Sequence, residues 1–102
     1  MRIRVRDICP DSRLFRADGE QLRRAILDRW EQGEPVEVDF ENESIASLSF
    51  FDEAIAVLFL DRSRDEVLSH LRTMNMVAGD RDLLNRQVGQ RILEATKAAA
   101  SG

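Results

Sequence analysis

The chain lacks the features that mark secreted, membrane-spanning and disulfide-bonded proteins. Its one cysteine, Cys9, cannot form a disulfide within the chain, which fits a reducing compartment. The longest strongly apolar run, residues 54–60, is too short to cross a bilayer. The N-terminus alternates charged and apolar residues, unlike the continuous apolar core of a signal peptide. We therefore expect a cytoplasmic protein without a membrane segment.

Charge and histidine content argue against further classes of function. The 102 residues carry a net charge of −4, so we expect no basic surface for nucleic acid. His70 is the only histidine, with no cysteine near it in sequence, which argues against a metal site. The sequence contains no glycine-rich phosphate loop and no nucleophile elbow, and we expect no cofactor.

Apolar periodicity predicts an alternation of strands and helices. Residues that alternate in polarity predict strands over residues 2–6, 36–40 and 71–76, with a short additional strand compatible with Leu14 and Phe15. Of these, the segment from Val36 to Phe40 is the clearest, and we expect it to be an inner strand of the sheet.

Helical spacing of apolar residues fills the intervals between these strands. Three helices are predicted to begin at Asp18, Ser49 and Gly79, and a short helical turn is predicted over residues 66–69. Residues 97–102 are expected to form a flexible tail. The order predicts one domain over residues 1–102, an α/β sandwich with a mixed sheet of about four strands and helices mainly on one face.

The segment from Val36 to Ala54 is the most informative stretch. It reads as a strand, a polar bend and a helix that begins with serines. Its pattern, V-x-V-D-F-x-x-x-x-I-x-x-x-S-F-x-D-E, resembles the STAS-like domain family, which is related to the STAS domains of anti-sigma factor antagonists. Weaker likeness at Phe15-Arg16 and at Met74-Asn75-Met76 extends the resemblance over most of the chain.

The resemblance implies a bacterial-type signalling module that is not an enzyme and that binds a protein partner. The implied partner is a histidine-kinase-like ATPase or an anti-sigma-type protein. In STAS antagonists a serine or threonine at the start of the second helix is phosphorylated, a position that falls on Ser49, or on Ser47 in another alignment of the loop. The antagonists usually have Asp-Ser-Ser/Thr-Gly there, and this chain lacks the acidic residue and the glycine. The simpler interpretation of Ser49 is a helix N-cap that contributes about 1 kcal/mol.

The partner-binding surface expected from this resemblance is the mouth of the second helix. Beside the serines, we expect Phe50 to be partly exposed and to contact the partner, together with Asp52. Asp39 is expected to belong to the same partner-binding surface, and also to cap or brace the second helix from the preceding strand.

Two other functions stay open. The arginine-rich first strand could pair with that of a second copy. The expected oligomeric state is therefore either a monomer or a weak homodimer. A group of acidic residues could form a magnesium or acid–base site of a small enzyme, and its members are Asp39, Glu41, Glu43, Asp52 and Glu53. A solvated acidic rim is the simpler interpretation of that group.

Overall fold

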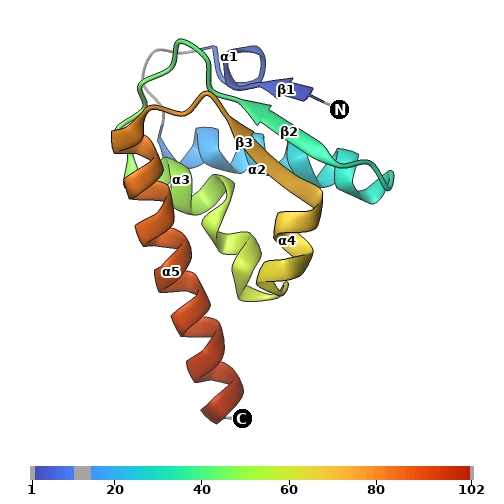
Figure 1. The fold of residues 1–102 in the computed structure, drawn as a ribbon, viewed down its shortest axis with the longest axis vertical. Coiled ribbons are helices and arrows are strands. Elements are labelled where there is room, and N and C mark those ends of the chain that lie inside the picture. The colour runs from blue at the N-terminus through green and yellow to red at the C-terminus, as the bar shows by residue number, and fades with distance from the viewer. Residues whose placement is uncertain (1, 11–14, 102) are drawn as a thin grey trace.

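The computed structural model describes residues 2–10 and 15–101, and its strands form one sheet (Figure 1). The elements, in chain order, are β1 (Arg2–Arg4), α1 (Val5–Ile8), α2 (Arg16–Glu31), β2 (Val36–Asp39), α3 (Leu48–Ala54), the 3₁₀ helix η1 (Ala56–Leu60), α4 (Arg64–His70), β3 (Leu71–Met74) and α5 (Ala78–Ser101). The strand order is β1-β2-β3, and both neighbouring pairs are parallel. The sheet in the described residues therefore has three parallel strands, instead of about four in a mixed arrangement.

The expected position of β2 as the inner strand is confirmed. Successive side chains of a strand point to opposite faces of the sheet, so Val36 and Val38 share one face. Both are buried on the side that faces the helices. On the other face, Arg2, Glu37 and Arg72 occupy neighbouring positions in the register of the three strands. Each strand thus contributes apolar residues to the core and charged residues to the opposite face.

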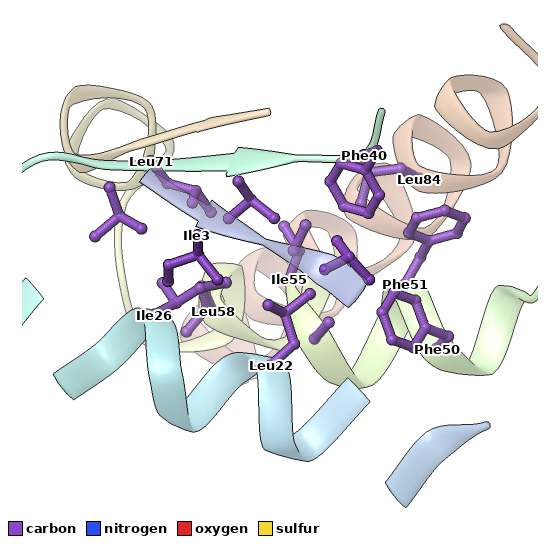
Figure 2. Packing of buried hydrophobic residues seen from close by; sticks show 14 of the residues in the cluster. Ile3, Leu22, Ile26, Phe40, Phe50, Phe51, Ile55, Leu58, Leu71 and Leu84 are labelled. Carbon is purple, nitrogen blue, oxygen red and sulfur yellow. The ribbon is translucent and has the colours of Figure 1, made fainter. Parts of the chain in front are cut away.

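The core lies between the sheet and the helices. Figure 2 shows side chains of the strands meeting those of α2, α3 and η1 in one layer. The largest fully buried apolar side chains in this layer are those of Phe40, Phe50, Phe51, Leu22, Ile26 and Leu58. Burial of such side chains is the main stabilising contribution, at roughly 1.5–3 kcal/mol for each.

The close packing of α2 on α3 depends on a glycine. Gly19 is buried, and a Cβ atom placed on it would lie 2.6 Å from the carbonyl oxygen of Phe50 and 3.1 Å from the amide nitrogen of Ala54. The two backbones therefore approach as closely as they do only because residue 19 has no side chain.

The bounds of several elements differ from the sequence-based expectations, and all three strands are shorter than predicted, with β2 ending at Asp39 and β3 at Met74. β1 ends at Arg4, because Val5 already begins the short helix α1. α2 begins at Arg16, and Asp18 does not precede the helix as a cap. Its carboxylate lies inside the first turn and accepts a hydrogen bond from the backbone N–H of Phe15 at 2.9 Å. Leu14 lies outside the described residues, and Phe15 directly precedes α2, so the short additional strand is not found at Phe15.

The last helix is longer than expected. α5 continues to Ser101, although a flexible tail was expected from residue 97. Its final turns include three successive alanines, the residues with the highest helix propensity, at positions 98–100. Figure 1 shows that the C-terminal half of α5 projects beyond the rest of the fold. Within residues 2–10 and 15–101, no helix combines the length and apolarity needed to span a membrane.

Candidate interaction site at the mouth of helix α3

The loop between β2 and α3, residues 40–47, crosses the end of the sheet where the parallel strands finish. The start of α5 lies at the same end, because α5 follows β3 (Figure 1). Loops at this end of a parallel sheet commonly carry binding residues. The candidate site is therefore defined as this loop together with the first turn of α3.

Asp39 holds the start of this loop. Its side chain is buried, and one carboxylate oxygen, Oδ1, accepts hydrogen bonds from the Asn75 side-chain amide and the Glu41 backbone N–H, both at 2.9 Å. The amide of Asn75 contributes most to lowering the pKa of Asp39 below its usual value. The expectation that Asp39 braces the second helix is thus wrong in its target, since the residue ties β2 to the turn after β3.

Asp80 holds the far end of the loop. This buried residue, in the first turn of α5, accepts hydrogen bonds from the backbone N–H groups of Ile45 at 2.7 Å and Ala46 at 2.8 Å. From the sequence, a helix start was expected at Gly79, directly before Asp80, and Asp80 was given no role in the site. Its acidic side chain near a helix N-terminus was the available signal, but the partners lie 34 and 35 positions away.

The loop between these anchors has an unusual backbone. Asn42 and Ala46 both have positive φ, at 63° and 50°. Alanine rarely adopts this region, because its Cβ approaches the neighbouring carbonyl. Glu43 adds two further restraints, a backbone hydrogen bond to the Phe40 carbonyl at 3.0 Å and an ion pair with Arg6 at 3.0 Å. The loop conformation is therefore set by its surroundings rather than by intrinsic preference.

The serines lie where the loop enters α3, but their roles differ from the expectation. Ser47, not Ser49, is the N-cap, and its hydroxyl oxygen accepts a hydrogen bond from the Phe50 N–H at 3.2 Å. Ser49 lies in the first turn, with its hydroxyl 3.2 Å from that of Ser47. Both residues are half-buried. The two hydroxyl groups thus form a pair at the mouth of α3.

This assignment predicts different costs for removing the two hydroxyl groups. Ser47→Ala is expected to lower the free energy of unfolding by about 1 kcal/mol, because the Phe50 N–H loses its acceptor. Ser49→Ala is expected to change it by less than about 0.5 kcal/mol. Urea denaturation of both variants measures the difference. A larger loss for Ser49→Ala would show that the cap is assigned to the wrong serine.

Phe50 does not lie on the surface as expected. Its side chain is fully buried and packs edge-on against Phe51, with ring centroids 5.6 Å apart. The exposed apolar residue at the mouth of α3 is instead Leu48, with 41% of its surface accessible. Leu48 therefore replaces Phe50 as the apolar contact candidate.

Asp52 is also placed in the interior, where it joins α3 to α5. Its carboxylate is 2% exposed and accepts two hydrogen bonds from Arg91, one from Nε at 2.7 Å and one from Nη2 at 2.6 Å. Arg16 of α2 adds a third at 3.2 Å. The bond from Arg91 is the main reason that the pKa of Asp52 is lowered to about 2. Asp52 is consequently a structural residue and not a free contact for a partner.

The acidic residues proposed for a metal or acid–base site do not gather in one place. Asp39 and Asp52 have the separate partners described above, and Glu53 pairs with Arg16 and Arg23. Throughout the part of the chain that the structure describes, no three His, Cys, Asp or Glu side chains are grouped so that they could hold a metal ion.

Comparison with known proteins adds one match. The sequence profile of a STAS-like domain of unknown function matches residues 18–81. This span runs from the first turn of α2 to the first turn of α5, so it includes the loop, the two serines and both of the loop's anchoring aspartates. The comparisons with curated proteins and with solved structures gave no match.

Proposed function

Because the chain belongs to the family of STAS-like domains of unknown function, we propose that it is a regulatory module, without catalytic activity, that binds a protein partner through the mouth of α3. The observation that carries this proposal is the constrained loop. Buried Asp39 and Asp80 hold its two ends, and two of its residues have left-handed backbone conformations. A loop that is already ordered loses little conformational entropy when a partner binds.

The surface of this loop suits a protein contact. Five of its eight residues are polar, of which Glu41, Asn42 and Ser44 are exposed, and the exposed apolar residue Leu48 follows immediately. As partner we propose a histidine-kinase-like ATPase or an anti-sigma-type protein. The hydroxyl groups of Ser47 and Ser49 are then the candidate phosphate acceptors, and a phosphate there would add about −2 of charge to the contact surface.

Calorimetric titration with a purified histidine-kinase-like ATPase tests the proposal. Ser49→Asp and Leu48→Asp are each expected to weaken binding at least about tenfold, since each places charge in the contact. Ser69→Asp is the matched control, because Ser69 is exposed on α4, at the opposite end of the strands. Unchanged binding of both site variants would refute this surface.

Mass spectrometry after incubation with the ATPase and ATP tests the switch separately. Phosphate is expected on Ser47 or Ser49. The signal should be lost when the modified serine is replaced by alanine. Exclusive modification of other serines would refute the switch and leave the docking result standing.

Self-association is the alternative that the fold keeps open. β1 is an edge strand, and in the described structure its outer side has no strand partner. Light scattering distinguishes the two proposals. A dimer whose formation depends on concentration, and is lost in Ile3→Pro, would favour pairing through β1.

A further inference from the structure

A groove runs along the other edge of the sheet, away from the proposed site. It has a volume of about 370 Å³ and lies between β3, α4, η1 and α5. The apolar residues that line it are Ile55, Phe59, Val67, Leu68, Leu71, Leu84 and Val88. Leu68 is 58% exposed, so part of this apolar lining is open to solvent.

The groove also contains the free edge of β3. The Met74 carbonyl accepts a hydrogen bond from the Phe40 N–H, on the side of β3 that faces β2. Backbone groups of successive strand residues point to alternate sides, so those of Thr73 point away from β2. In the described residues no strand pairs with this side of β3, and Figure 1 shows β3 running from the end of α4 toward the loop before α5. Thr73 therefore offers an unpaired donor and acceptor beside an apolar surface.

The charged residues that line the groove have one sign. Arg64, Arg72 and Arg81 line it, all three are exposed, and none of the described lining residues is acidic. In the described part of the chain none of the three forms an ion pair, and Arg81 donates a hydrogen bond to the hydroxyl of Thr73 at 3.3 Å. Three unpaired arginines in a protein of net charge −4 make this a local positive surface.

We propose that this groove binds an extended acidic segment of another protein, which adds to the sheet as a further strand beside β3. Its backbone pairs with that of Thr73, alternate apolar side chains enter the groove, and its carboxylates meet the three arginines. The apolar floor and the backbone edge favour a peptide over nucleic acid, which needs a broad basic surface. This surface is separate from the mouth of α3, so either proposal can fail alone.

Peptides selected from a random display library on the immobilised chain provide the probe. We expect them to alternate apolar and acidic residues. Anisotropy with the synthesised peptides is expected to show binding at least about tenfold weaker to Arg64→Glu/Arg81→Glu. Both substitutions fall in the first turns of helices, where acidic residues are favourable, so folding is retained. The matched control, Arg24→Glu/Arg86→Glu, changes charge equally at exposed positions outside the groove.

Hydrogen exchange at the Thr73 amide reports on strand pairing itself. Peptide binding is expected to slow it at least about tenfold, which side-chain contacts alone would not do. The proposal is overturned if no selected peptide depends on the two arginines, or if the Thr73 amide is unaffected. Two further outcomes overturn the proposal when no peptide binds. In the first, the chain binds single-stranded DNA and the double arginine variant does not. In the second, light scattering shows a dimer that the double arginine variant does not form.

Discussion

Asp52→Asn is expected to lower the free energy of unfolding by about 3 kcal/mol, the lower end of the cost of breaking a buried ion pair. The substitution preserves shape but removes the charge that Arg91 and Arg16 contact from α5 and α2. The lower end applies because both arginines remain partly accessible to water. Urea denaturation at pH 7 measures the loss. Asp61→Asn, which alters an exposed ion pair with Arg62, is the control and should cost less than about 1 kcal/mol.

The same ion pair predicts how stability depends on acid. The pKa of Asp52 is lowered from 3.8 to about 2, mainly by Arg91, so the folded state favours the ionised carboxylate. Its stabilising contribution is complete above pH 4 and is lost as the pH falls toward 2. The stability of the native chain should therefore decline more steeply over this range than that of Asp52→Asn. The pKa values of Asp39 and Glu53 are also lowered, and these residues account for the pH dependence that the native chain and the variant share. If stability fell equally with pH in the native chain and in Asp52→Asn, Asp52 would not contribute.

Gly19→Ala is the second substitution with a large expected effect. The added methyl group would lie 2.6 Å from the Phe50 carbonyl oxygen, so α2 and α3 must separate. Loss of about 2–3 kcal/mol is expected, as for an overpacked core, with a corresponding fall in melting temperature. Thermal unfolding followed by circular dichroism measures it.

Gly89→Ala provides the matched control for this effect. Gly89 lies within α5, and apart from its chain neighbours and the nearby backbone of α5, a Cβ there would meet no heavy atom of the described residues within 4 Å. Because alanine favours the helix, this variant should be as stable as the native chain or up to about 1 kcal/mol more stable. Equal stability of the two variants would contradict the close approach of α2 and α3 at Gly19.

The elements that sequence analysis predicted best are those with a clear period. β2 was identified because Val36, Val38 and Phe40 alternate with acidic residues, and the inner position of the strand was confirmed. The segment that forms α3 and η1 shows no clear polar and apolar sides, since residues 50–60 are apolar on most sides. Exposure along it could not be derived, and Phe50 was consequently assigned to the surface although it is buried.

The two errors about the start of α3 have one physical origin. Ser49 and Asp52 have the spacing of a capping box, and Ser49 was accordingly expected to be the N-cap. The structure shows that Asp52 turns inward to Arg91, which lies 39 positions later in the chain. Local spacing cannot report such a contact, because it depends on how α5 packs against α3. For the same reason Asp80, which holds Ile45 and Ala46, was missed as a residue of the candidate site.

The parallel arrangement of the three strands has a consequence for the rate of folding. Arg2 pairs with Glu37 and Val36 with Leu71, so each pairing joins residues 35 positions apart, and no strand can form a hairpin with its neighbour. The entropy of closing these long loops must be lost before the sheet gains a single hydrogen bond. Folding should therefore proceed on the slower timescale of chains with high contact order, and stopped-flow refolding should show the sheet forming after much of the helical signal.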